Sequence, residues 1–408
     1  MTHPDSLITH DTWSELHHFQ PKPAIDFKRL HAYRHERLRE QMRKLDVSLC
    51  VIVNPISLRY ALDYQNYALF QSHIPATYVF FPVEGPIVLH NGFDSGVTVD
   101  EIRPGHPINF FEGGDSLSRF APLVADDIVG FLEEIGHKGG KVAVEYVNPS
   151  LTQAVMDKGL SVIDGVLITE MARVIKSPDE VACMQWAVNV AEYGVGKMRE
   201  SLVPGISELQ LWGLLNYTNL ANHGGWHEGH MLASGPRINP WLQSATQRRV
   251  ESGDLVGFDT DMVGPYGYFA DLSRTFHCGP AKPTPRQKYL YQIAKEEVDY
   301  NLALVKPGIS FSEFQAKAFP VPEEFHQNAY TVVIHGVGMC DEYPAIRPRF
   351  RGEVHYDGNL EAGMVICVES YMGAVGERDG VKLEQQVLVT ENGYELMTRF
   401  PYEESLLS

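Results

Sequence analysis

Three aspartates lie close together in DLVGFDTDMVGPYGYFADLSRTFHCG, residues 254–279 of the 408-residue chain. Asp259 and Asp261 stand two residues apart, so on a strand both would project from the same face. Asp271 lies on the strand that is predicted to return after a turn at 264–267. Carboxylates about 4 Å apart in a poorly solvated site repel each other by several kcal/mol. Because the surroundings are apolar and aromatic, the arrangement predicts a bound cation rather than an exposed acidic hairpin.

Three later strand-like segments supply matching groups. Glu369 lies in MVICVESY, Glu384 in VKLEQQVLV and His335 in TVVIHGVGM. An unpaired carboxylate in such an apolar run is costly, so each is expected to find a partner in the folded chain. With the aspartates they form a hard-oxygen set with one imidazole. Such a set suits two bridged divalent ions, such as iron, manganese or zinc, better than a thiolate site.

Strands and a long helix must position these groups. Residues 256–263 and 268–276 are strand-like and would form the two arms of the hairpin. A helix is predicted to begin at the capping-box sequence SPDE, residues 177–180, where serine suits the N-cap and proline the first turn. The apolar residues that follow recur at intervals of four and three, which predicts a buried helix face. Its members are Met184, Val188, Ala191, Val195, Met198 and Leu202.

The length and pattern of the chain predict two domains, because 408 residues exceed one ordinary compact core. The first part alternates a predicted helix at 27–45 with strand signals at 49–55, 77–92 and 141–147, as in a small α/β domain. The helix that begins at Ser177 then opens the second domain.

The tetrapeptide PGIS occurs twice, at 204–207 and 307–310. Each copy follows a helical segment and precedes another. The repeat is either coincidental or the trace of a duplicated α/β half, which a pseudo-twofold fold would leave behind.

Composition narrows the classes of function. The net charge of −18 argues against a protein that follows nucleic-acid phosphates. Five scattered cysteines fit a reducing compartment. The N-terminal MTHPDSLITHDTW does not read as a signal peptide, and no apolar run approaches the about 20 residues that cross a bilayer. We therefore expect a cytoplasmic enzyme for a small-molecule substrate, without nucleic-acid or membrane partners.

Taken together, the motifs FDTD…GYFADLSRTF, HGVG, CVES and KLEQQVLVT resemble the metal-ligand motifs of the creatinase/methionine-aminopeptidase superfamily, and IKSPDEVACM resembles the entry to its catalytic domain. The resemblance covers the whole chain. It implies a homodimer and an α/β (α+β) fold, with a small creatinase-like N-terminal α/β domain at 1–172 and a pita-bread catalytic domain at 173–408. The implied ligands of the two metal ions are Asp259, Asp261, Asp271, His335, Glu369 and Glu384.

Two departures separate the chain from the proline peptidases of this superfamily. Those enzymes carry a histidine before the first aspartate and another seven residues after the ligand histidine, and both stabilise the tetrahedral intermediate. Here Trp241 stands near the first place and Glu342 at the second.

The strings SGPRxNPW, FDTDxVGxYG, HGVGxCDE and KLExQVLxTExGYE instead resemble the DddP-type dimethylsulfoniopropionate (DMSP) lyases. This resemblance implies cleavage of DMSP into dimethyl sulfide and acrylate, with iron as the metal.

The resemblance also implies roles for residues outside the ligand set. β-Elimination needs a base for the proton α to the carboxylate, and Asp341 matches the base proposed for the lyases. It is expected in a loop beside an apolar strand, where an aspartate can also be an ordinary turn residue. The sulfonium of the substrate is a cation that an aromatic face can meet. Tyr330 matches a lyase residue of that kind, and Trp226 and Trp241 are further candidates, or plain packing residues.

Two alternatives to the lyase remain open. One is a metallohydrolase of the same fold that acts on an Xaa-Pro dipeptide or a related amide. The other is a non-enzymatic binding module, although such modules usually lose their metal ligands. The sequence WHEGH at 226–230 is not the HExxH metal motif, so His227 and His230 are expected to line the pocket or the surface.

Overall fold

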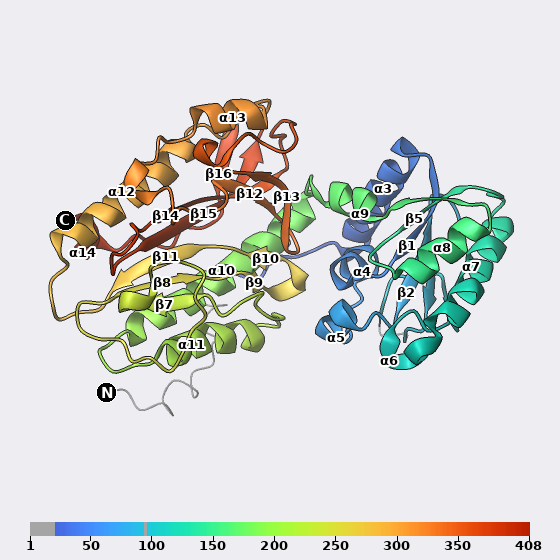
Figure 1. Cartoon of the computed structure of the whole chain (residues 1–408), viewed down its shortest axis with the longest axis horizontal. Helices are drawn as coiled ribbons and strands as arrows, with labels where there is room; N and C mark the ends of the chain where they lie inside the picture. Colours follow the sequence, from blue (N-terminus) through green and yellow to red (C-terminus); the bar gives the residue numbers. More distant parts are fainter. Residues whose placement is uncertain (1–20, 94–95) are drawn as a thin grey trace. The chain divides into compact units, whose positions relative to one another are not determined.

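The computed structural model describes residues 21–93 and 96–408 (Figure 1). The N-terminal segment that does not read as a signal peptide therefore lies outside the described residues. The chain divides into two compact units, of which one is Asp26–Arg173 and the other contains Val174–Ser408. Within the described ranges, no helix has the length and apolar character needed to cross a membrane.

The first unit contains a six-stranded sheet in the order β4-β3-β2-β1-β5-β6. Strands β1, β2 and β3 pair antiparallel, whereas β5 and β6 continue the sheet in parallel. The predicted helix at 27–45 and the predicted strands are all present. The strands are β1 Val47–Ile52, β2 Tyr78–Pro82, β3 Val88–His90, β4 Glu101–Arg103, β5 Lys141–Val144 and β6 Ser161–Asp164. The helices are α3 Phe27–Lys44, α4 Pro55–Leu62, α5 Ala68–His73, α6 Phe110–Gly113, α7 Leu117–Glu134, α8 Pro149–Asp157 and α9 Val166–Arg173.

The second unit contains antiparallel strands between two pairs of helices. The sheets run β11-β8-β7, β10-β9 and β13-β12-β14-β15-β16. In Figure 1, α10 and α11 lie on one side of these strands and α12 and α13 on the other. The helices are α10 Pro178–Ser201, α11 Glu208–Ala221, α12 Pro285–Leu302, α13 Phe311–Lys317 and α14 Glu404–Leu407. The strands are β7 Leu232–Ser234, β8 Leu255–Asp259, β9 Met262–Val263, β10 Phe269–Ala270, β11 Ser273–His277, β12 Ile334–Val337, β13 Asp341–Ile346, β14 Val365–Met372, β15 Val381–Thr390 and β16 Gly393–Leu396.

Helix α10 begins as the sequence predicts. The Ser177 hydroxyl accepts from the backbone N–H of Glu180 at 3.3 Å, and the Glu180 carboxylate accepts from the backbone N–H of Ser177 at 2.7 Å. This reciprocal pair satisfies two backbone donors that the first helical turn leaves open. All six residues of the predicted apolar face are buried, so the face lies in the core.

The hairpin that carries the aspartates is more bent than predicted. Strand β8 ends at Asp259, and Asp261 has φ 33°, outside the strand region. The hydroxyl of Thr260 donates to the carbonyl oxygen of Ala270 at 2.8 Å and accepts from the N–H of Leu272 at 3.0 Å. The Thr260 side chain thus forms hydrogen bonds with backbone groups that would pair with the opposite strand in a continuous ladder. The prediction of two unbroken arms, with Asp259 and Asp261 on one strand face, is therefore wrong.

The two PGIS segments have equivalent structures. The N–H of Gly205 donates to the Val250 carbonyl at 2.8 Å, and that of Gly308 donates to the Leu360 carbonyl at 2.7 Å. The serine of each segment is the N-cap of the next helix, α11 in one case and α13 in the other. The repeated contacts favour a duplicated half over coincidence.

This equivalence predicts matched effects of substitution in the two segments. Gly205 and Gly308 have φ of 98° and 84°, and a Cβ added to either glycine would meet no atom within 4 Å. Gly205→Ala and Gly308→Ala should each lower the free energy of unfolding by about 1–2 kcal/mol through backbone strain alone. Gly213→Ala is the control, because Gly213 lies in an open position inside α11 and alanine there should stabilise the helix. Urea titration measures all three, and a neutral effect at either PGIS glycine would contradict the expectation.

Candidate metal centre

Six side chains of the second unit converge on one cluster. They come from the hairpin at 254–279 and from strands β12, β14 and β15. Ligand atoms of Asp259, Asp261 and Asp271 lie within 4.8 Å of one another, as do those of Asp259, Glu369 and Glu384. A third group, which meets the same distance limit, has four members: Asp271, Glu384, His335 and Cys367. The structure thus brings together every residue that the sequence nominates as a metal ligand.

Strand register explains how residues so far apart in sequence meet. Glu369 on β14 lies directly opposite Glu384 on β15, and on the other side of β14 His335 lies opposite Cys367. Ser273, which pairs with Asp259 in the β8–β11 ladder, donates its hydroxyl to Glu384 at 2.7 Å. This bond joins the hairpin of the aspartates to the sheet of the glutamates.

Most of the cluster is buried, and its carboxylates carry like charges. Asp259, Asp271, Glu369 and Glu384 are each at most 2% exposed. Burial, together with the neighbouring Glu384, raises the pKa of Asp259 to about 7. The same two causes raise the pKa of Asp271 well above its ordinary value. Burial and the charge of Asp259 do the same for the pKa of Asp261.

The pKa values of His335 and Glu384 are shifted in the directions expected of a cation paired with an anion. Burial lowers the pKa of His335, but contacts with Glu369 and Glu384 outweigh it and hold that pKa well above the ordinary value. Nε2 of His335 lies 3.3 Å from Glu369 Oε1 and 3.4 Å from Glu384 Oε1. Burial opposes ionisation of Glu384, but the cations Lys382 and His335 outweigh it and lower its pKa.

Lys382 is a member of the cluster that sequence analysis missed. Its side chain is 0% exposed, and Nζ lies 3.0 Å from Asp259, 2.7 Å from Glu369 and 3.1 Å from Glu384. It stands two residues before Glu384 on β15, so both side chains leave the same face. The two-residue spacing of the lysine and the glutamate in VKLEQQVLV could have indicated in the sequence that both face the site.

The donor set fits two divalent cations. One oxygen each of Asp259, Asp271, Glu369 and Glu384 is buried without a hydrogen bond within the described part of the chain. In the state that would bind metal, with five ionised carboxylates, a neutral His335 and a protonated Lys382, the cluster would carry a net charge of minus four, which two divalent ions would cancel. Buried charges need such compensation. The residues that would hold the ions are Asp259, Asp261, Asp271, His335, Glu369 and Glu384.

Cys367 is the second residue that sequence analysis missed. Its thiol is buried within the group of Asp271, His335 and Glu384, and its sulfur lies 3.8 Å from the backbone carbonyl oxygen of Asp271. Burial and the neighbouring Asp271 carboxylate raise the pKa of Cys367 well above its ordinary value. Its place in CVES, two residues before Glu369, gave the same strand-face signal as that of Lys382.

Asp341 lies at the rim of the cluster. It is the first residue of β13 and pairs with Val337 of β12, so the expected loop position is wrong. The short turn at 338–340 lets pairing resume directly at Asp341. Its side chain is 66% exposed, and Oδ1 lies 3.4 Å from Nδ1 of His335.

The aromatic candidates occupy different surroundings. The Tyr330 ring lies 4.7 Å from the ammonium of Lys382, and the charge of Glu369, with burial, raises the pKa of Tyr330. Trp226 is half-buried and donates its indole N–H to Glu228 at 3.2 Å. Trp241 is 6% exposed and packs 5.9 Å from the ring of Tyr371, a packing position.

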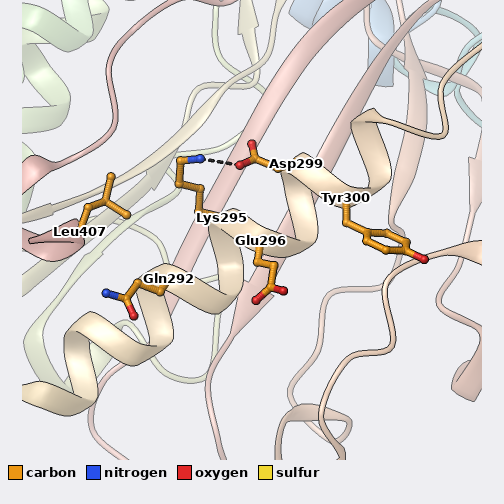
Figure 2. A pocket seen from close by; sticks show the side chains of 6 residues that line it. All are labelled: Gln292, Lys295, Glu296, Asp299, Tyr300 and Leu407. Carbon is orange, nitrogen blue, oxygen red and sulfur yellow. Dashed lines mark hydrogen bonds and ion pairs between the residues drawn. The ribbon is translucent and has the colours of Figure 1, made fainter.

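The histidines of WHEGH stand apart from the three ligand groups. His227 is half-buried, with Nδ1 2.8 Å from the carbonyl oxygen of Thr260, and burial lowers its pKa to about 4. His230 is exposed. Figure 2 shows a different feature, a hollow on the outer face of α12 that is lined by Gln292, Lys295, Glu296, Asp299, Tyr300 and Leu407 and by none of the candidate site residues.

The fold and this cluster define a metallopeptidase-type enzyme unit. The model of metallopeptidase family M24 matches residues 182–391, and the chain belongs to that family. Among its relatives is the dimethylsulfoniopropionate lyase DddP of Roseovarius nubinhibens, 33% identical over 94% of this chain and 88% of that protein. The DddP lyase of Roseobacter denitrificans is 32% identical over the same shares. The predicted family and the predicted resemblance to the DddP lyases are confirmed.

Peptidases of the family are more distant in sequence. The Xaa-Pro dipeptidase of Pyrococcus furiosus is 29% identical over 56% of this chain and 64% of that protein. A solved Xaa-Pro dipeptidase of Bacillus anthracis superposes with a TM-score of 0.72 at 22% identity, covering 91% of this chain and 99% of that one. This likeness confirms the predicted α/β fold class with a pita-bread catalytic part.

The pKa shifts predict that stability depends differently on pH with and without metal. The pKa of Asp259 is raised to about 7, so its favourable contribution to the chelated protein is lost as pH rises from about 4 through about 7. His335, whose pKa is also raised, loses its contribution in the same direction at higher pH. The thermal midpoint of chelated protein should therefore fall between about pH 5 and about pH 8. Metal-loaded protein should not show this fall, because metal binding requires ionised carboxylates. Calorimetry of both forms checks this, and parallel curves would contradict it.

Lys382→Met tests the charge balance. Without metal, three buried carboxylates would lose their cation, which should cost about 3–5 kcal/mol of stability. Added divalent metal should then raise the thermal midpoint more in the variant than in the wild type, because less positive charge opposes the ions. Lys295→Met is the matched control, because Lys295 pairs with Asp299 on the surface of α12 (Figure 2) and should change stability by less than about 0.5 kcal/mol. Equal effects of the two substitutions would contradict the assignment.

Proposed function

We propose that this protein is a metal-dependent carbon–sulfur lyase that cleaves DMSP into dimethyl sulfide and acrylate. The observation that carries the proposal is the convergence of six side chains that could hold metal ions, with the exposed carboxylate of Asp341 3.4 Å from His335. Two DddP lyases that match 94% of this chain support the choice of substrate. The acidic and imidazole ligands are all present, so a binding module without metal is not favoured.

The reaction removes one proton and breaks one bond. A base takes the proton from the carbon α to the carboxylate, the electrons of that C–H bond form the double bond of acrylate, and the C–S electron pair leaves with dimethyl sulfide. Bound divalent ions supply Lewis acidity for the substrate carboxylate and for the negative charge that develops beside it. The chain must supply the base and a surface for the sulfonium.

Asp341 is the proposed base. Its exposed carboxylate can reach a substrate held at the cluster, whereas the carboxylates of Asp259, Asp271, Glu369 and Glu384 are buried and close to one another. Nδ1 of His335 lies beside it. Trp226 and Tyr330 are the proposed aromatic surfaces for the sulfonium. Trp241, also a sequence candidate, would act at most through packing against Tyr371.

Several further properties belong to the proposal. The proposed metal is iron, which the resemblance to the DddP lyases implies, with zinc or manganese as alternatives that the same oxygen-rich donor set accepts. We also propose a cytoplasmic homodimer, with residues 1–172 as the creatinase-like domain and 173–408 as the catalytic domain.

The main alternative is hydrolysis of an Xaa-Pro dipeptide, which the named activities of the peptidase relatives raise. The position seven residues after His335 argues against it. There Glu342 points inward to Lys176, at 2.9 Å, and offers no imidazole to a tetrahedral intermediate.

The proposal predicts that the metal-loaded protein releases dimethyl sulfide and acrylate from DMSP in equal amounts. Asp341→Asn should keep its metal and its fold but lose about 10²–10⁴-fold in kcat, because an amide cannot accept the α-proton. Gas chromatography of dimethyl sulfide and metal analysis of the same samples measure both effects.

Asp299→Asn is the matched control, because Asp299 lies on the outer face of α12 (Figure 2) and should keep full activity. An active Asp341→Asn variant would overturn the assignment of the base. Release of free proline from Xaa-Pro dipeptides without release of dimethyl sulfide from DMSP would favour the peptidase instead.

A further inference from the structure

A buried ion pair lies directly behind the proposed base. Lys176 Nζ and Glu342 Oε2 are 2.9 Å apart, and the two side chains are 2% and 0% exposed. Such a pair contributes little net stability, because desolvation of both charges offsets their attraction. Its best-attested use is to fix one arrangement of the chain.

Glu342 holds the turn between β12 and β13. Its second carboxylate oxygen accepts from the backbone N–H of Met339 at 3.0 Å. A Cβ on Gly338 would lie 2.4 Å from both oxygens, so the carboxylate fills the space beside that glycine. The carbonyl of Gly338 in turn accepts from the N–H of Phe269, in the hairpin of the aspartates, at 2.7 Å. The turn is thus attached on one side to Glu342 and on the other to the metal-site hairpin.

Lys176 provides a fixed point for Glu342. It precedes Ser177, the N-cap of α10, and its backbone N–H donates to the carbonyl of Gly363 at 2.9 Å. Its ammonium also reaches the carbonyl of Val174, at 3.4 Å. The ion pair therefore ties the start of β13 to the start of a long buried helix.

Asp341 depends on this anchorage. Neighbouring residues on a strand point to opposite sides, so the side on which Glu342 is held also determines the side of β13 on which Asp341 lies. The Asp341 side chain is 66% exposed, so packing does little to orient its carboxylate. Its distance of 3.4 Å from His335 is set mainly by the backbone.

We propose that the Lys176–Glu342 ion pair is a positioning pair for Asp341, which fixes the 338–342 turn so that the carboxylate of Asp341 faces His335 and the cluster. The inference rests on the proposed role of Asp341 as base. Glu342 stands at the position where the peptidases carry a histidine. In this proposal it is the anion of the positioning pair, a role that requires a buried and charged side chain.

The test compares a charge-free pair with a conservative one. Lys176→Met/Glu342→Met removes both charges together, which avoids leaving one of them buried and unpaired. It should fold, bind the same amount of metal and keep KM for DMSP within about threefold, while kcat falls about tenfold to a hundredfold, the effect of misplacing a reacting group by about 1 Å. Lys176→Arg keeps the pair and should retain most of kcat. If the double variant does not fold, Glu342→Gln replaces it, with the same loss of kcat expected.

Arg199→Met is the control for a general loss of stability. Arg199 on α10 pairs with Glu403 at 2.9 Å, outside the cluster, and its removal should lower the thermal midpoint without changing kcat. A folded charge-free variant with wild-type kcat would overturn the proposal. An Arg199→Met variant that loses as much kcat as the charge-free variant would also overturn it, because the loss would then follow from lower stability.

Failure of the proposed function gives a different result. It would appear in the wild type, as no release of dimethyl sulfide. Crystal structures of the wild type and the charge-free variant would then decide the positioning claim without any activity. The claim predicts that the Asp341–His335 separation increases in the variant, and an unchanged separation would overturn it.

Discussion

Mutual repulsion among buried carboxylates constrains the whole catalytic unit. Asp259, Asp271, Glu369 and Glu384 are almost fully removed from water, and Lys382 supplies one internal cation for them. A single ammonium cannot compensate so many negative charges in a poorly solvated site. The raised pKa of Asp259 and the oxygens that lack hydrogen bonds in the described part of the chain express the same shortage of positive charge. Two divalent ions would remove it.

The fold provides the rigidity that such a centre requires. The side chains of the cluster come from two antiparallel sheets, which are joined where the Ser273 hydroxyl meets Glu384 and where the Gln386 side chain accepts from the N–H of Asp271. The repeated PGIS contacts place an equivalent capped helix in each half of the unit. The proposed base lies outside this rigid set, on a turn that needs its own anchor.

Much of this arrangement could be predicted because it depends on local rules. The capping box indicated the start of α10, and the apolar runs around Glu369 and Glu384 indicated that these carboxylates would find a partner in the folded chain. The break at Thr260 could not be predicted, because it depends on a threonine hydroxyl that replaces backbone partners across the hairpin. Lys382 was overlooked because a lysine on a strand usually points to solvent, and only the convergence of three distant acids makes its burial favourable. Trp241 was offered as a substrate contact because sequence does not distinguish an aromatic wall from a core residue.

Occupancy of the cluster by cations is the claim on which the proposed lyase depends. Anomalous diffraction from crystals of the full chain loaded with manganese tests it most directly. We predict two anomalous peaks per chain, one beside Asp259, Glu369 and Glu384 and the other beside Asp271, His335 and Glu384. Fully loaded crystals with no peak in this cluster, or with manganese bound elsewhere on the chain instead, would contradict it.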